Sequence, residues 1–223
     1  MDGFLALFSQ YNIPGAFLVN IELTLWSALF STILGVILVM MRISPIASLR
    51  TVSGAYVELF KNLPLTIIMV FMVLGAYAQL KFSFSDTFAT NFFWLAVTGL
   101  SLYTAAFVCE SLRSGINTVP LGQAEAARAL GLNFMQAATQ IILPQAFKNV
   151  LPAMCNEFVA VTKETSLAST FYVGDLMTQY QTISGKTYLV IEPLVIIGVI
   201  YFVVTFSMSK LITVLERRLK NDD

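Results

Sequence analysis

The sequence predicts an all-α integral membrane protein, with residues 1–223 as one domain and five helices that cross the bilayer. Of its 223 residues, 57% are hydrophobic and only 12% are charged, unlike a soluble domain. A helix of about 20 mostly apolar residues crosses a bilayer core of about 30 Å. Five runs approach that length, and the Lys and Arg residues fall mainly on one side of them.

The composition also excludes several classes of function. Thirteen Lys and Arg balance thirteen Asp and Glu, so no basic excess is available to hold nucleic acid. The chain has no His, which rules out a Ser-His-Asp triad and an HExxH zinc helix. Cys109 and Cys155 lie in apolar stretches without a CxxC spacing and are expected to be apolar packing. We therefore expect no catalytic residues, metal or cofactor.

Four of the five runs have the composition of ordinary spanning helices. The first covers residues 18–41, with Glu22 as its only charge, and lacks the basic start and cleavage site of a signal peptide. The second, residues 63–80, follows Pro64, which suits a first helical turn. The third and fifth cover residues 92–109 and 189–211.

The fourth run, residues 150–168, is more polar than the others. It carries Glu157, Lys163 and Glu164 among its apolar residues. Ionisable groups at membrane depth generally face a bundle interior or a wet cavity. Glu157 and Glu164 are seven positions apart, which places them on the same face of a helix. We expect that face to line a polar route.

An odd number of spans puts the two chain ends on opposite sides of the membrane. With the N-terminus outside, only Lys81, Lys163 and Lys186 fall on outer segments. The other ten basic residues then fall on inner segments: Arg42, Arg50, Lys61, Arg113, Arg128, Lys148, Lys210, Arg217, Arg218 and Lys220. Because cytoplasmic segments are enriched in Lys and Arg, the sequence predicts an N-out, C-in orientation.

The inner segment between the third and fourth spans, residues 113–148, is too long for a simple connection. It is rich in Ala, Leu, Gln and Glu, which favour helix. We expect a first helix over residues 121–130, a turn at Gly131, and a second helix from the N-cap Asn133 to about Leu143, stopped by Pro144.

This segment contains a motif with fixed spacing, EAA-x3-G-x9-I-x-LP, formed by Glu125, Ala126, Ala127, Gly131, Ile141, Leu143 and Pro144. It resembles the EAA motif of ATP-binding-cassette (ABC) importer permeases. Residues 60–65 (FKNLPL), 110–115 (ESLRSG) and 162–169 (TKETSLAS) are similar to elements of the polar amino acid branch of that family. The branch usually has Arg where this chain has Lys61. Lysine keeps the positive charge but lacks the planar guanidinium group that binds a carboxylate through two hydrogen bonds.

The resemblance implies a type I importer permease of a bacterial cell membrane. Its implied partners are a second permease (the same or a homologous chain), two cytoplasmic ATPases and an extracellular or periplasmic solute-binding protein. The chain has no GxxxxGK[ST] phosphate loop, so ATP hydrolysis is expected on the partner subunits. The implied substrate is a polar amino acid, with glutamate as the best candidate.

Two sets of site residues follow from the resemblance and the charges. Glu125, Ala126, Ala127 and Gly131 are expected to couple the permease to an ATPase, with the small residues allowing close approach. The alternative is an amphipathic helix on the lipid surface. Such helices usually have a polar face rich in Lys and Arg, whereas this one has only Arg128.

The second set comprises Lys61, Glu157 and Glu164 as substrate-pathway residues. The carboxylates would meet an amino acid's ammonium group, and the lysine a carboxylate. The alternative is an interhelical ion pair of Lys163 with either glutamate, or snorkelling. Glu22 and Glu192 are expected at headgroup level, and residues 171–182 as a short outer helix that closes the pathway or touches the binding protein.

Two other classes of function were weighed. An ATP-independent secondary transporter or channel is disfavoured by the EAA segment and by the lack of two internally repeated halves. An intramembrane enzyme is disfavoured because no nucleophile, base or metal cluster can be assembled.

Overall fold

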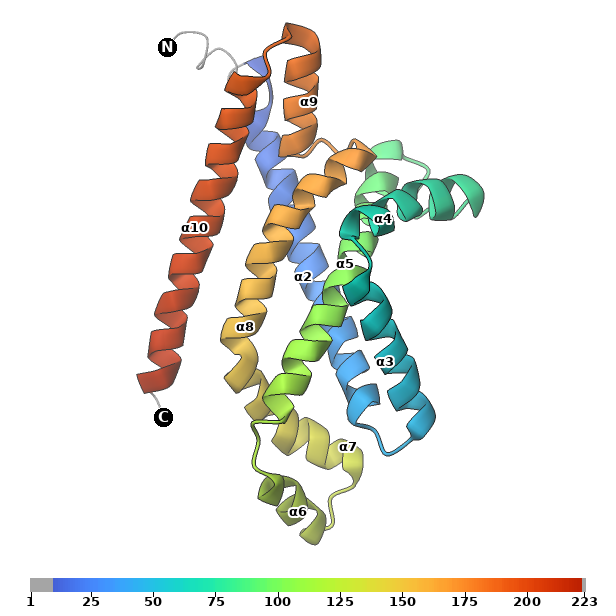
Figure 1. Ribbon diagram of the computed structural model, residues 1–223, viewed down its shortest axis with the longest axis vertical. Helices are drawn as coiled ribbons and strands as arrows, with labels where there is room; N and C mark the ends of the chain where they lie inside the picture. Colours follow the sequence, from blue (N-terminus) through green and yellow to red (C-terminus); the bar gives the residue numbers. More distant parts are fainter. Residues whose placement is uncertain (1–9, 222–223) are drawn as a thin grey trace.

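A computed structural model describes residues 10–221, with side chains as far as Val214, so the side chains of Arg217, Arg218 and Lys220 lie outside the described part. Within it every regular element is helical (Figure 1). In chain order these are α2 (Ile13–Ile43), α3 (Ala47–Asn62), α4 (Leu65–Val70), the π-helix η1 (Phe71–Gln79), α5 (Phe88–Ile116), α6 (Leu121–Ala129), α7 (Phe134–Ala137), the π-helix η2 (Ala138–Ile142), α8 (Leu143–Glu164), the 3-10 helix η3 (Thr165–Phe171), α9 (Leu176–Thr187) and α10 (Ile191–Asn221).

The predicted first, third and fifth spans are present as α2, α5 and α10. In the described chain these three helices are each long and apolar enough to cross a membrane. Each is longer than its apolar run, because the helix continues into polar residues at one or both ends. Helices α2 and α5 pack along each other, whereas α10 lies beside α8 and α9 (Figure 1).

The predicted second span is not a simple crossing. A helix does follow Pro64, but α4 and η1 together cover only Leu65–Gln79 and are bent by 102° from the preceding α3. The break has a local cause: Leu63 is extended, at φ −94° and ψ 134°, as expected of a residue before proline. Helix α3 was missed in the sequence because Arg50, Glu58 and Lys61 interrupt its apolar residues. The bent pair is a candidate for one further crossing.

The predicted fourth span is longer than its apolar run and starts earlier. The expected stop at Pro144 is wrong, because Pro144 lies in the first turn of α8, where a missing N–H costs no intrahelical bond. The helix also passes through Pro152 before it tightens into η3 after Glu164. The expected outer helix of residues 171–182 is α9, shifted to Leu176–Thr187.

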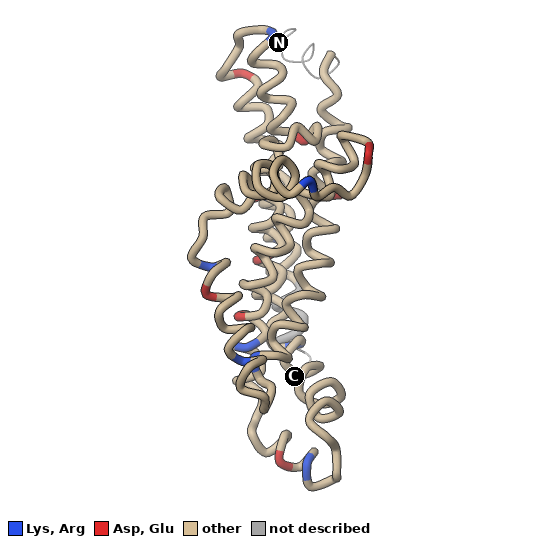
Figure 2. Tube along the Cα trace, turned by 90° about the vertical axis from the view of Figure 1, so that its right-hand side faces the viewer, with Lys and Arg blue, Asp and Glu red and all other residues tan. Residues whose placement is uncertain are grey.

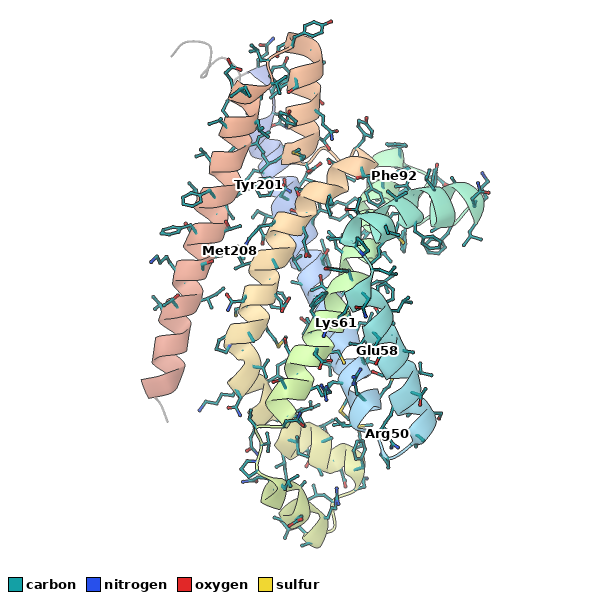
Figure 3. The ribbon with its side chains drawn as sticks, in the orientation of Figure 1. Arg50, Glu58, Lys61, Phe92, Tyr201 and Met208 are labelled. Carbon is teal, nitrogen blue, oxygen red and sulfur yellow. The ribbon has the colours of Figure 1, made fainter. Side chains whose placement is uncertain are left out.

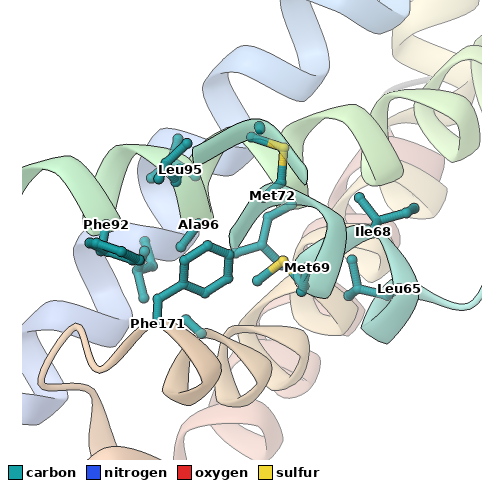
Figure 4. Packing of buried hydrophobic residues seen from close by; sticks show 13 residues of the cluster. Leu65, Ile68, Met69, Met72, Phe92, Leu95, Ala96 and Phe171 are labelled. Atoms are coloured by element: carbon teal, nitrogen blue, oxygen red, sulfur yellow. The ribbon is translucent and has the colours of Figure 1, made fainter. Parts of the chain in front are cut away.

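Helix α5 is the centre of the packing and contacts α2, α3, α4, η1, α8 and η3. At one end, Phe171 of η3 packs among Met69, Met72 and Phe92, as Figure 4 shows. At the other end, α5 packs with α2, α3 and α8 through a second cluster that includes Val57, Cys109 and Met154. Cys109 is fully buried there, as expected of an apolar packing residue. Because α5 is packed at both of its ends, the residues on its face toward α8 are held in fixed positions.

Candidate functional site

A cavity of about 230 Å³ lies between α5 and α8 and contains both predicted pathway carboxylates. Glu157 and Glu164 line it from α8, together with Ala160 and Val161. Both glutamates are partly buried. The neighbouring Val159 and Thr162 are buried, so α8 packs into the bundle on a face other than the one that carries the two glutamates. The two carboxylates are two turns apart, about 10 Å along the axis.

The facing wall of the cavity comes from α5, and sequence reasoning did not single it out. It consists of Tyr103, Thr104 and Phe107. Thr104 is 2% exposed, and its hydroxyl has no hydrogen-bond partner among the described residues. A buried hydroxyl without a partner is uncommon, because it loses the free energy of its bonds to water. The sequence held only a weak signal, one Tyr-Thr pair inside an apolar run, so α5 was taken as an ordinary span.

Lys61 lies at the end of α3, outside the residues that line the cavity (Figure 3). Its side chain is exposed, and no ion pair joins it to a described acidic residue. Lys61 is therefore not brought into the cavity with the two glutamates.

The alternative of an ion pair between Lys163 and a pathway glutamate is not found. Lys163 is exposed and is paired with neither glutamate, whereas Arg113 forms an ion pair with Glu110 at 2.5 Å. Both partners of that pair belong to the ESLRSG element at the end of α5. Glu22 and Glu192, to which no role was assigned, are both exposed.

The segment with the EAA motif forms the pole of the molecule toward which α10 runs (Figure 1). Glu125 and Ala126 on α6 are exposed, whereas Ala127 is 1% exposed and faces its own chain, where α6 packs against η2. The small residues of the motif were all expected to allow close approach to a partner, but the side chain of Ala127 is covered by its own chain. Leu121 and Leu130 at the two ends of α6 are 83% and 80% exposed.

The turn after α6 follows the predicted design. Gly131 has φ +83°, a left-handed conformation that favours glycine. Asn133 then caps the next helix: its side chain accepts from the Gln136 N–H at 2.9 Å, and the Gln136 side chain accepts from the Asn133 N–H at 3.0 Å. The turn holds α6 beside α7 and η2 with its outer face open.

Comparison with known proteins places the chain in a family. Residues 29–221 match the model of the binding-protein-dependent transport system inner membrane component. The chain belongs to this family. The permease is 44% identical over 200 residues to the glutamate transport system permease protein GluC of Corynebacterium efficiens, covering 87% of this chain and 88% of that one. It is 34% identical to the arginine transport system permease protein ArtQ of Bacillus subtilis, covering 92% and 91% of the two chains.

Solved structures agree with this assignment. The permease matches a chain in the crystal structure of an amino acid ABC transporter with histidines, with a TM-score of 0.81 and 32% identity over 98% of this chain and 96% of that chain. A chain of the inward-facing MetNI methionine ABC transporter matches with a TM-score of 0.67 at 20% identity, covering 91% of this chain and 95% of that chain, and supports the fold alone. The predicted all-helical permease fold is thereby confirmed.

Proposed function

We propose that this permease is the membrane subunit of an ATP-driven importer of a polar amino acid, with glutamate as the first candidate. The observation that carries the proposal is the EAA-bearing helix α6, exposed at one pole of a chain whose relatives are named as glutamate and arginine transport permeases. A protein that has no phosphate loop of its own needs an energy source outside the chain, and an exposed helix provides a surface for it.

The proposed topology has five crossings with the N-terminus outside and the C-terminus in the cytoplasm of a bacterial cell. Helices α2, α5 and α10 supply three crossings, the bent pair α3 and α4–η1 supplies one, and α8 with η3 supplies the last. The basic residues gather toward the pole that carries α6 and the end of α10 (Figure 2), which supports placing that pole inside. Residues 1–223 then form one permease domain, with residues 113–148 as its cytoplasmic coupling loop.

The proposed coupling is mechanical. Glu125 offers a charge-assisted hydrogen bond to an ATPase, and Leu121 and Leu130 offer apolar contacts on either side. Ala126 permits close approach, while Ala127 and Gly131 hold α6 on its own chain. Since α7, η2 and α8 follow one another without a break, a displacement of α6 reaches the cavity glutamates through α8. The assembly contains two ATPases, a second permease and an outer solute-binding protein.

The proposed pathway runs along the cavity between α5 and α8. Glu157 and Glu164 face the ammonium group of an amino acid, and Lys61 in the last turn of α3 meets a carboxylate. The exposed position of Lys61 suits a group that meets the substrate at the edge of the route. The Thr104 hydroxyl supplies a further polar contact on the opposite wall.

The test is to disrupt the coupling loop. Glu125→Lys and Gly131→Pro should each abolish copurification of the ATPase and ATP-dependent uptake of amino acid into vesicles supplied with loaded binding protein. Asp86→Lys, the same charge change on an exposed residue far from α6 in sequence, is the matched control and should change neither. Uptake that persists on an ion gradient without any ATPase would reject the proposal. Supplying binding protein loaded with glutamate, glutamine or arginine in turn identifies the substrate.

A further inference from the structure

Asn20, near the beginning of α2, makes side-chain hydrogen bonds to three other elements. Its amide nitrogen donates to the hydroxyl of Thr165 on η3 at 2.9 Å and to the hydroxyl of Tyr201 on α10 at 2.8 Å. Its amide oxygen accepts from the backbone N–H of Leu176, the first residue of α9, at 2.9 Å. Asn20 is 2% exposed. Both amide hydrogens and the amide oxygen are thus used in one buried place.

Thr165 carries the effect of Asn20 to the end of α8. Besides accepting from Asn20, its hydroxyl donates to the carbonyl of Thr162 at 2.7 Å, in the last turn of α8. Thr165 is fully buried and directly follows Glu164, at the point where the α-helix tightens into η3. The chain from Asn20 through Thr165 to Thr162 therefore fixes the backbone on both sides of the cavity glutamate.

The same side chain also fixes the start of α9. The first turn of a helix leaves backbone N–H groups without intrahelical partners. Asn20 satisfies that of Leu176, and the buried carboxylate of Asp175 accepts from those of Met177 and Thr178. Tyr201, labelled on α10 in Figure 3, closes the set from a fourth element. Three consecutive elements, η3, α9 and α10, are thus joined to α2 at one amide, across 145 to 181 positions of sequence.

We propose that Asn20 is a positioning residue for transport, which holds Glu164 at its place in the cavity through Thr165. The inference rests on the proposed function, since it assigns Asn20 to the same pathway. Interhelical hydrogen bonds in membranes are modest in free energy, so the loss of Asn20 leaves a folded protein whose cavity glutamate is less well placed. An Asn20 that served packing alone would change the amount of folded protein without changing its transport.

The experiment measures amino acid moved per ATP hydrolysed, in proteoliposomes that hold the complete transporter and saturating loaded binding protein. Asn20→Leu and Thr165→Val should each lower this ratio by about threefold or more, the factor expected for loss of the one interhelical hydrogen bond that the two residues share. Thr165→Ser keeps the hydroxyl and should restore the wild-type ratio. Asn91→Leu is the matched control, because Asn91 is also 2% exposed but accepts from the Phe84 N–H away from the cavity.

The double variant Asn20→Leu/Thr165→Val separates positioning from general damage. If both residues act through one bond, the double variant has the ratio of the more impaired single variant, whereas independent effects multiply. A wild-type ratio in Thr165→Val, or equal losses in Asn91→Leu and Asn20→Leu, overturns the inference. If Asn20→Leu does not assemble, the Thr165→Val and Thr165→Ser pair still decides. A wild-type transporter without ATP-dependent uptake would instead reject the proposed function.

Discussion

Gly115 on α5 and Val150 on α8 are so close that no side chain fits between them. A β-carbon placed at Gly115 would lie 1.9 Å from Cγ2 of Val150 and 2.9 Å from the carbonyl oxygen of Ala146. Val150 can turn its side chain away, but the Ala146 carbonyl belongs to the helix backbone. Gly115 therefore sets the distance between the two helices that enclose the cavity, which gives a physical reason for the glycine at the end of the ESLRSG element.

Gly115→Ala should destabilise the permease although alanine favours helix. We expect a loss of about 1–3 kcal/mol, the range found for overpacked cores, measured as a lower unfolding midpoint in detergent. Gly198→Ala on α10, where a β-carbon meets nothing within 4 Å, is the control and should be neutral or slightly stabilising. Adding Val150→Ala should recover only part of the loss, because the Ala146 carbonyl stays in place. A neutral Gly115→Ala variant would show that α5 and α8 are not in close contact.

Glu157→Gln should impair uptake while the ATPase still copurifies. The substitution keeps the size of the side chain but removes the charge that, in the proposed pathway, faces the substrate ammonium group. We expect uptake to fall by about tenfold, as for one lost hydrogen bond to a charged group. Glu192→Gln, at an exposed residue in the first turn of α10, removes the same charge and should leave uptake unchanged. Unchanged transport by Glu157→Gln would remove it from the pathway.

The sequence predicted the parts of this fold that are set by local chemistry. The left-handed turn at Gly131 and the cap at Asn133 depend on residues within a few positions of each other, and both were correctly placed. The shared face of Glu157 and Glu164 follows from helical period alone. The EAA motif identified the family before any tertiary contact was known.

The parts that were missed depend on contacts between distant residues. The bend between α3 and α4 leaves α3 as a separate helix, whose Ser53 hydroxyl donates to the Leu38 carbonyl at 2.7 Å, a partner that no pattern indicates. Thr104 became a candidate only when α8 was placed opposite it. Likewise, Asn20 in an apolar run looks like an isolated polar residue until Thr165, 145 positions away, lies beside it.

Gly131→Ala should weaken the docking of the ATPase through backbone strain. At φ +83° an added β-carbon meets no atom within 4 Å, so the cost is conformational, about 1–2 kcal/mol for a residue with a side chain. Asparagine tolerates this region better, so the ATPase should copurify in the order glycine, asparagine, alanine. Gly122→Ala on α6, also with open space around its β-carbon but with helical backbone, should copurify as well as wild type. Equal copurification by all the variants would mean that the turn does not orient α6.

Asn133→Ala should loosen the second helix of the coupling loop by removing its cap. The Asn133 side chain accepts from the Gln136 N–H, and such a cap is worth about 0.5–2 kcal/mol. Amide hydrogen exchange over residues 133–137 should become faster, and transport should fall because α7 links α6 to α8. Asn133→Asp keeps an acceptor at the same place and should exchange like wild type. Gln136→Ala removes only the reciprocal bond to the Asn133 N–H, so it should show a smaller increase in exchange than Asn133→Ala; an equal increase would mean that the two bonds stabilise the turn only as a pair.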